Sequence, residues 1–283
     1  MNCSSTKTPN VCWGSEVGGE QKHVLTERRG HVLHIRINRP EVRNALDPLA
    51  YHQLSLACDE LEADPELWLG VLTGEGEHAF SAGRDLKQLA ATSTASQEEL
   101  DAEAALWQRT TRLTDRFNFT KPLIARLNGS AHGGGLELAL ACDIIVAAEH
   151  AQLSLPEPRR GLIATAGGVH RLPRQIGLKA AMGYLLTGRA MTAQRGYELG
   201  LINEVVPANL LDEAVEQWVA DILACAPLAV RATKACAMQG LDLPLAQAVS
   251  QRYEAEERRK LSADSLEGPR AFAEKRRPHW RGC

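Results

Sequence analysis

The feature that most constrains this chain is a glycine-rich turn that leads directly into an apolar segment. Residues 128–137 read Asn-Gly-Ser-Ala-His-Gly-Gly-Gly-Leu-Glu, and residues 138–148 that follow are almost entirely apolar. Three consecutive glycines allow positive φ angles and a close approach of the backbone to a ligand. A helix that is apolar on every face is buried on all sides. The stretch therefore predicts a ligand-binding turn at the start of a buried helix.

Two glutamates stand out against this background. Glu137 is in the first turn of the predicted buried helix, and Glu157 lies between two prolines in Leu-Pro-Glu-Pro. Burying a carboxylate is costly, so each is a candidate site residue, and a pair in one pocket can divide acid and base work. The alternatives are a carboxylate that only complements the helix dipole at Glu137 and an exposed loop side chain at Glu157.

The rest of the chain alternates short apolar strands with helices, which predicts an α/β fold with parallel βαβ units and right-handed crossovers. A hairpin is expected over His23–Glu27 and His31–Asn38, and a helix capped by Asp47 reaches about Ala63. Further strands are expected at Trp68–Thr73, Pro122–Leu127, Ile144–Ala148 and near residues 204–206. Further helices are expected at residues 97–119, 169–176, 178–188, 192–199, 210–226, 228–240 and 245–261.

A second glycine turn, Phe80-Ser81-Ala82-Gly83, follows another short apolar segment, and Asp85 can cap a short helix after it. Open α/β sheets bind ligands at the carboxyl ends of their strands. The two turns together can present backbone N–H groups to one carbonyl oxygen, which is an oxyanion hole. The alternative is that both glycine clusters are only turns.

Composition excludes several classes of function. The hydrophobic fraction of 44%, the charged fraction of 24% and the net charge of −3 describe an ordinary globular protein without a nucleic-acid footprint. Seven cysteines, an odd number without a CxxC pair, predict reduced thiols and a cytoplasmic location. Residues 1–21 lack the apolar core of a secretory signal and are expected to be a mobile leader. No membrane span, dinucleotide fingerprint, Walker loop or metal-ligand pair is present, so no metal is expected. His132 and His170 lie near glycine turns but lack a partner nucleophile.

Several motifs in a fixed order make the chain resemble the crotonase superfamily, in particular enoyl-CoA hydratases, over about residues 22–280. The motifs are Asn38-Arg39-Pro40-Glu41 with Asn44-Ala45-Leu46, Phe80–Leu86, His132–Glu137 leading to Ala141–Ile144, Pro156–Gly161, Ala166–Leu172 and Ala193–Ile202. The resemblance implies a ββα spiral core over residues 22–210, and a helical C-terminal part over residues 211–283 that serves in homotrimer or homohexamer assembly.

The resemblance also implies an activity: hydration of the 2,3 double bond of an enoyl-CoA to a 3-hydroxyacyl-CoA, as in fatty-acid β-oxidation. In such enzymes the N–H groups of Ala82 and Gly134 would hold the thioester oxygen, while Glu137 and Glu157 would activate water. Coenzyme A belongs to the substrate, and no separate cofactor is implied. The residues expected to line the substrate path are Arg43, Ala45, Gly83, Arg84, Asp85, Leu86, Gly133, Pro156 and Thr165.

One position departs from the hydratase pattern, because Thr165 stands eight residues after Glu157, where these enzymes usually have glycine. The basic loop Pro158-Arg159-Arg160 is also unusual. Three interpretations therefore remain open: a hydratase, an enoyl-CoA isomerase or another enzyme of enolate chemistry on an acyl-CoA, and a non-catalytic acyl-CoA or RNA-binding relative.

Overall fold

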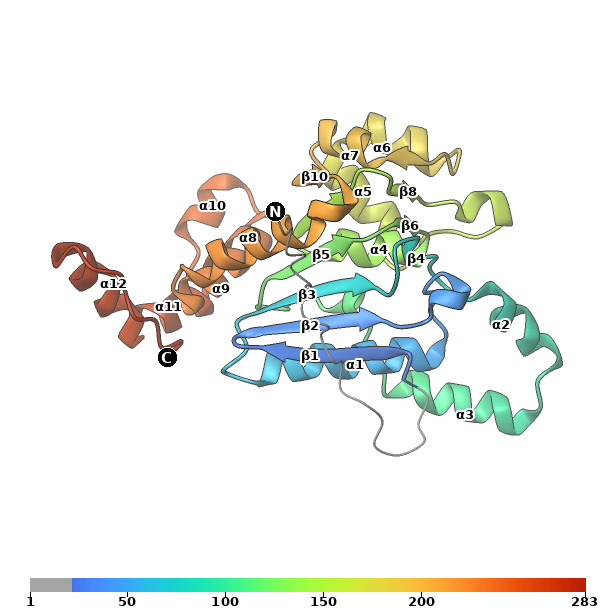
Figure 1. The fold of residues 1–283 in the computed structure, drawn as a ribbon, viewed down its shortest axis with the longest axis horizontal. Coiled ribbons are helices and arrows are strands. Elements are labelled where there is room, and N and C mark those ends of the chain that lie inside the picture. The colour runs from blue at the N-terminus through green and yellow to red at the C-terminus, as the bar shows by residue number, and fades with distance from the viewer. Residues whose placement is uncertain (1–21) are drawn as a thin grey trace, which may run out of the picture.

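The computed structural model describes residues 22–283, so the leader predicted for residues 1–21 lies outside the described part of the chain. The fold is mixed α/β, as expected, with two sheets (Figure 1). The larger sheet has the strand order β1 (Val24–Arg29), β2 (Val32–Ile37), β3 (Leu69–Gly74), β5 (Leu123–Leu127), β7 (Ile144–Ala148) and β10 (Glu204–Val206). The predicted β1–β2 hairpin is antiparallel, and the other pairs are parallel.

The smaller sheet carries the surroundings of the glycine turns. Its order is β4 (Ala79–Ser81), β6 (Ser130–His132), β8 (Gln152–Ser154) and β9 (Met191–Thr192). In its register Ser81 pairs with Ala131, and His132 pairs with Ser154. These strands were not predicted from the sequence, because two or three residues are too few to show an alternating pattern. The parallel strands β4, β6 and β8 end at the same edge of this sheet, so the three segments that follow them meet there.

The described residues also form twelve α-helices and five 3-10 turns, of which α8 to α12 and η5 follow the last strand. The helices are α1 (Pro48–Ala63), α2 (Leu86–Ala91), α3 (Gln97–Gln108), α4 (Gly134–Ala141), α5 (Gly168–Ile176), α6 (Leu178–Leu185), α7 (Ala193–Glu198), α8 (Leu211–Leu223), α9 (Pro227–Gly240), α10 (Leu245–Ser250), α11 (Glu254–Lys260) and α12 (Ala263–Ala273). The 3-10 turns are η1 (Pro40–Val42), η2 (Thr92–Thr94), η3 (Leu113–Asp115), η4 (Glu157–Arg160) and η5 (Ala208–Leu210).

Two apolar clusters hold the layers together. One contains α1, the buried helix α4 and the face of β2 that carries Leu33, Ile35 and Ile37. The other lies on the opposite face of the main sheet, where α8 packs on Val71 and Val146. Alternation along the strands separates the two faces, and burial of these side chains from water stabilises both layers. Figure 1 shows α9 to α12 leading away from the sheets toward the C-terminus.

The prediction of a helix over residues 97–119 was wrong, because α3 ends at Gln108. The Thr110 hydroxyl donates to the carbonyl oxygen of Leu106 at 2.8 Å, which offers that carbonyl a side-chain partner at the helix end. Beyond the end of the helix, Leu113 is buried, whereas Phe117 is 77% exposed.

The helix expected over residues 245–261 is divided into α10 and α11. The hydroxyl of Tyr253, between them, donates to the carbonyl oxygen of Ala248 at 2.8 Å and folds the segment back. Helix α12 was not predicted as a separate element, but it lies in the helical C-terminal part that the resemblance implies. Within residues 22–283, no helix is long and apolar enough to cross a membrane.

The contact between β4 and α4 depends on a missing side chain at Gly135. A Cβ atom at this position would lie 2.2 Å from the carbonyl oxygen of Ser81, far inside van der Waals contact. The backbones of the helix and the strand therefore touch directly. The position of α4 against the smaller sheet requires glycine here.

We expect Gly135→Ala to lower the free energy of unfolding by about 1–3 kcal/mol or more, because the new methyl group must push two backbones apart. Chemical denaturation measures the change. Gly183→Ala is the matched control: Gly183 is exposed in α6 and nothing lies within 4 Å of a Cβ there, so stability should rise by about 0.5–1 kcal/mol. Equal stability of Gly135→Ala and the parent protein would contradict the close contact.

Candidate active site

A cavity of about 960 Å³ opens where β4, β6 and β8 end, beside the N-terminus of α4. Almost all of the residues singled out in the sequence line it. They are Arg43, Ala45, Ala82, Arg84, Asp85, Leu86, Gly133, Gly134, Glu137, Pro156, Glu157 and Thr165. Gly83 is the exception, since it is buried and packs beneath the cavity wall: a Cβ on it would lie 2.6 Å from the Gly134 nitrogen. The structure thus brings both glycine turns and both glutamates together.

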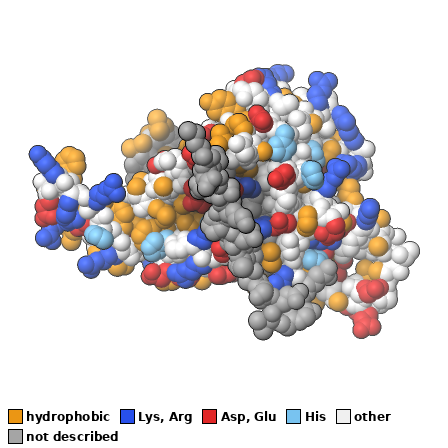
Figure 2. All heavy atoms as spheres, in the orientation of Figure 1, with side chains coloured by type: hydrophobic (Ala, Val, Ile, Leu, Met, Phe, Trp, Pro, Cys, Tyr) orange, Lys and Arg blue, Asp and Glu red, His pale blue; other side chains and the backbone are white. Residues whose placement is uncertain are grey.

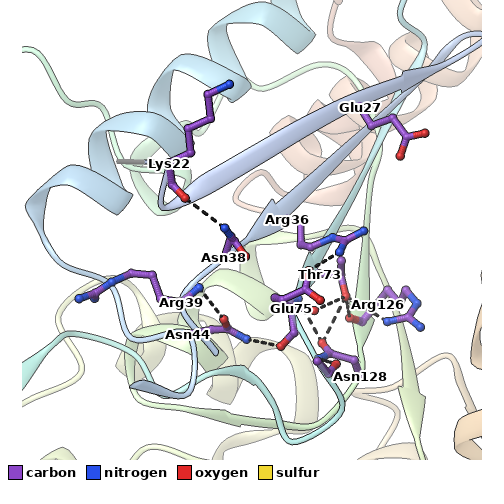
Figure 3. A network of polar contacts seen from close by, with 12 residues as sticks. Lys22, Glu27, Arg36, Asn38, Arg39, Asn44, Thr73, Glu75, Arg126 and Asn128 are labelled. Atoms are coloured by element: carbon purple, nitrogen blue, oxygen red, sulfur yellow. Dashed lines mark hydrogen bonds and ion pairs between the residues drawn. The ribbon is translucent and has the colours of Figure 1, made fainter. Parts of the chain in front are cut away.

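Two buried asparagines hold the chain that leads into the first turn. The Asn44 amide donates to the carbonyl oxygens of Glu75 and Ala79 and accepts from the Arg39 N–H (Figure 3). Asn128, at the end of β5, accepts from the Gly74 N–H and donates to Ala79 as well. Each of these hydrogen bonds satisfies a backbone group in a buried loop. Together they place β4, and so the turn after it, next to α4.

The first turn offers a different N–H group from the expected one. The Ala82 N–H donates to the carbonyl oxygen of Arg43 at 2.9 Å, so the prediction that it serves as an oxyanion donor was wrong. The Gly83 N–H donates to the Ser81 hydroxyl at 3.1 Å. Among the hydrogen bonds of residues 22–283, none engages the N–H of Arg84. The available donor is therefore two residues further along.

The Gly134 N–H is the second available donor. Gly134 is the first residue of α4, where backbone N–H groups have no partner within the helix. The Arg84 nitrogen lies 3.5 Å from the point that a Cβ on Gly134 would occupy, so the two N–H groups are neighbours. The positive end of the helix dipole adds to their field. This part of the cavity wall can accept a negatively charged oxygen.

Glu137 is buried, with 4% of its surface exposed. Its Oε1 accepts a hydrogen bond from the N–H of Gly168, at the start of α5, at 2.8 Å. Burial raises its pKa, and the charge of Glu157 raises it further, whereas the Gly168 hydrogen bond opposes the rise. A Cβ on Gly168 would lie 3.0 Å from that Oε1, so glycine at this position leaves room for the carboxyl group. The carboxyl group is thus held firmly and retains a proton more readily than a free glutamate.

Glu157 is half-buried at the start of η4. Burial raises its pKa, whereas a hydrogen bond from its own backbone N–H and the charge of Arg160 oppose the rise. Its Oε2 is buried and has no hydrogen-bond partner among the described residues. Its Oε1 would lie 2.9 Å from a Cβ on Gly133, whose φ of 55° favours glycine. The glycine turn therefore leaves room for this carboxyl group.

Thr165 lines the cavity, but its backbone N–H already donates a hydrogen bond to the carbonyl oxygen of Ile163 at 2.8 Å. The backbone donor that hydratases usually have eight residues after the second acid is thus occupied here. The donor that reaches an acid is instead the Gly168 N–H, on Glu137.

Tyr51, Arg112 and His132 are among the further residues that line the cavity and were not assigned to it from the sequence. Burial raises the pKa of Tyr51 to about 12, with Glu137 also raising it. His132 lies 2.8 Å from the Ser154 hydroxyl, and burial lowers its pKa, as do Arg160 and Arg43. Tyr51 faces inward from α1 within an apolar pattern, and nothing in the sequence distinguishes it from a core aromatic residue.

Known proteins resemble this chain over more than nine tenths of its length. The family model for enoyl-CoA hydratase/isomerase matches residues 27–283. (E)-benzylidenesuccinyl-CoA hydratase of Thauera aromatica is 35% identical, with 92% of this chain and 99% of that protein covered. Carnitinyl-CoA dehydratase of Proteus mirabilis is 38% identical, with 92% and 98% covered.

A solved structure of an enoyl-CoA hydratase from Mycobacterium tuberculosis superposes with a TM-score of 0.83 at 38% identity, covering 93% of this chain and all of that chain. The chain belongs to the enoyl-CoA hydratase/isomerase family, and its fold is that of the crotonases. The fold expected from the resemblance is thereby confirmed.

The raised pKa of Glu137 has a consequence for stability. Below the unfolded-state pKa of about 4.5 the carboxyl group is neutral in both states, whereas above it the unfolded state ionises first. The wild type therefore loses stability as the pH rises from about 4.5 through the folded-state pKa. We expect Glu137→Gln, which keeps the acceptor for Gly168, to avoid this loss.

Chemical denaturation at several pH values between 4 and 8 measures the difference, which should be near zero at pH 4 and should favour the variant increasingly above it. Glu60→Gln on the exposed face of α1 is the control and should show no such trend. A variant less stable than the wild type at pH 8 would contradict the cost of burying the charge.

Proposed function

We propose that this protein is a hydro-lyase that interconverts a 2-enoyl-CoA and a 3-hydroxyacyl-CoA. The observation that carries the proposal is the meeting of two carboxyl groups of raised pKa and two unpartnered N–H groups in one cavity. The first pair can handle protons, and the second can hold the oxygen on which charge develops.

The thioester oxygen is placed between the N–H groups of Arg84 and Gly134. When water adds to C3, electrons move through the conjugated system onto this oxygen and give an enolate. The two donors and the α4 dipole stabilise that negative charge more than they stabilise the neutral carbonyl, which lowers the barrier.

The two acids divide the proton transfers. Glu137 accepts the Gly168 N–H, which favours its ionised form, so we assign it as the base that takes a proton from water. Glu157 has a buried Oε2 without a partner, and we assign it as the acid that delivers a proton to C2. The water lies between the two carboxyl groups in this scheme, and each residue exchanges its role in the reverse direction.

We place the coenzyme A part of the substrate at the mouth of the cavity. The exposed cations that line the cavity are Arg43, Arg84, Lys87, Arg159 and Arg160, and such a group suits phosphate groups. The two named relatives act on benzylidenesuccinyl-CoA and carnitinyl-CoA, so family members with this degree of identity differ in their acyl groups.

Double-bond isomerisation is the second candidate, because one observation favours it. The Thr165 N–H is occupied by Ile163 and does not help to position water. An isomerase needs the same oxyanion site, but it takes a proton from C2 of a 3-enoyl-CoA, delivers a proton to C4 and adds no water.

We expect Glu137→Gln and Glu157→Gln each to lower the turnover of enoyl-CoA hydration by about 10²- to 10⁴-fold, since each variant loses one proton-transfer group. Loss of absorbance at the conjugated thioester band measures hydration of 2-enoyl-CoA esters. Binding of a saturated acyl-CoA should change by no more than about threefold. Full activity of either variant would contradict the two-acid assignment.

A 3-enoyl-CoA substrate distinguishes the two candidate reactions, hydration and isomerisation. Given a 3-enoyl-CoA, a hydratase leaves the absorbance unchanged, whereas an isomerase produces a conjugated 2-enoyl-CoA. Appearance of the band in the wild type, without hydration of 2-enoyl esters, would replace the hydratase with the isomerase.

The oxyanion site has its own test at Gly134. Proline is well tolerated at the first position of a helix but has no N–H, so we expect Gly134→Pro to lower turnover by about 10²- to 10³-fold. Gly134→Ala is the matched control, since it adds a Cβ at the same distance of 3.1 Å from the Tyr51 hydroxyl and keeps the N–H. If both variants lose the same activity, crowding explains the loss and the N–H does not.

Assembly into a homotrimer or homohexamer stays a prediction, which the mass of the protein in solution tests. Figure 2 shows hydrophobic side chains gathered over the C-terminal helices. Exposed apolar residues of this part include Leu241, Leu245, Val249, Leu261, Leu266 and Phe272. A surface of this kind supports contacts between copies of the chain.

A further inference from the structure

An arginine lines the cavity together with Glu137, the more buried of its two glutamates. Arg112 follows α3, and its side chain, 34% exposed, lines the cavity with Tyr51 and Glu137. The turn η3 directly after it packs against α4, so the backbone near Arg112 is held by the same helix that carries Glu137. Arg112 is therefore part of the wall of the site.

One edge of its guanidinium group is fixed. Nε and Nη2 donate to the two oxygens of Asp115 at 2.7 and 3.2 Å, a fork that orients the planar group. No hydrogen bond or ion pair of the described residues engages Nη1. Asp115 is more exposed than Arg112, at 43%, so water screens its charge more strongly. The remaining edge of Arg112 keeps its capacity to bind an anion.

Arg112 lies apart from the cations of the cavity mouth. The cations of the mouth come from the residue after η1, from the start of α2 and from η4. Arg112 instead precedes η3, which packs against α1 and against α4, the helix that carries Glu137. Burial raises the pKa of Glu137, and Arg112 opposes this rise. Arg112 thus reaches the cavity from the α4 side, near Glu137.

This separation matters for the substrate. Once the coenzyme A phosphates occupy the cations of the mouth, Arg112 is left beside the acyl group. A purely hydrocarbon acyl group would cover the free N–H groups of Nη1 and leave them without partners, at a cost in binding. An acyl group that carries a carboxylate would accept from them through a charge-assisted hydrogen bond.

We infer that Arg112 selects acyl-CoA esters whose acyl chain carries a carboxylate, so that the substrates of this enzyme are CoA monoesters of unsaturated dicarboxylic acids. The inference rests on the proposed function only for the direction in which the acyl chain lies, with the thioester at Arg84 and Gly134. The carboxylate then lies beyond the reacting carbons and binds Nη1.

Binding of unreactive esters tests this without any turnover. The probes are succinyl-, glutaryl- and adipyl-CoA, each compared by calorimetry with the neutral ester in which an isopropyl group of the same shape replaces the carboxylate. We expect the wild type to prefer the charged ester about tenfold at the chain length that fits best, since hydrogen bonds to charged groups are strong. Arg112→Gln should abolish the preference, and Arg112→Lys should keep part of it.

The matched control is Arg109→Gln, an exposed arginine three residues earlier that does not line the cavity. It should keep the full preference. Equal binding of charged and neutral esters by the wild type at every length would overturn the inference, as would an unchanged preference in Arg112→Gln or an equal loss in Arg109→Gln.

Kinetics separate this role from a purely electrostatic action on Glu137. The substrates are 4-carboxybut-2-enoyl-CoA and its neutral counterpart 5-methylhex-2-enoyl-CoA. If Arg112 selects the carboxylate, Arg112→Gln raises KM about tenfold for the charged ester and leaves KM for the neutral ester unchanged. An equal shift of the pH profile with both esters, without a change in their ratio, would contradict selection. If neither ester is hydrated while the binding preference persists, the hydratase proposal fails and the role of Arg112 stands.

Discussion

The structure depends on the direct contact between two backbone turns that lie far apart in the sequence. Gly135 touches the Ser81 carbonyl, and Gly83 touches the Gly134 nitrogen, both at distances that leave no space for a Cβ atom. Asn44 and Asn128 support the contact by tying the chain before β4 to its surroundings. Every function proposed for the cavity requires this contact, because it brings the unpartnered N–H groups of Arg84 and Gly134 together.

The two acids come from elements with different constraints. Glu137 belongs to a buried helix and receives a hydrogen bond from the start of another, whereas Glu157 sits in a short turn with one oxygen unpartnered. Burial raises both pKa values for the same physical reason, but the hydrogen bonds that oppose the rise differ: Glu137 accepts from Gly168 of another helix, and Glu157 accepts from its own backbone N–H. This asymmetry allows two identical side chains to take different roles.

Long periodic elements were predictable from the sequence, and short ones were not. The hairpin β1–β2, helix α1 and the strands β5 and β7 agree with expectation, because each carries a clear apolar pattern or cap. The strands of the smaller sheet have two or three residues each and form through pairing with distant segments. Helix α3 was predicted too long because the apolar residues beyond Gln108, such as Phe117, do not share one buried face.

The sequence by itself determined the fold class, the glycine turns and the two candidate acids. Glycine runs cost conformational entropy and buried carboxylates cost desolvation free energy, so both mark positions where the structure or the function requires them. Only the tertiary structure decided which N–H groups are available: the Ala82 N–H donates to the carbonyl oxygen of Arg43, whereas the unpartnered N–H of Arg84 lies near Gly134. It also decided that Tyr51 and Arg112 face the cavity. Hydrogen-bond partners and side-chain directions across such distances follow from packing between segments, and local patterns in the chain do not encode them.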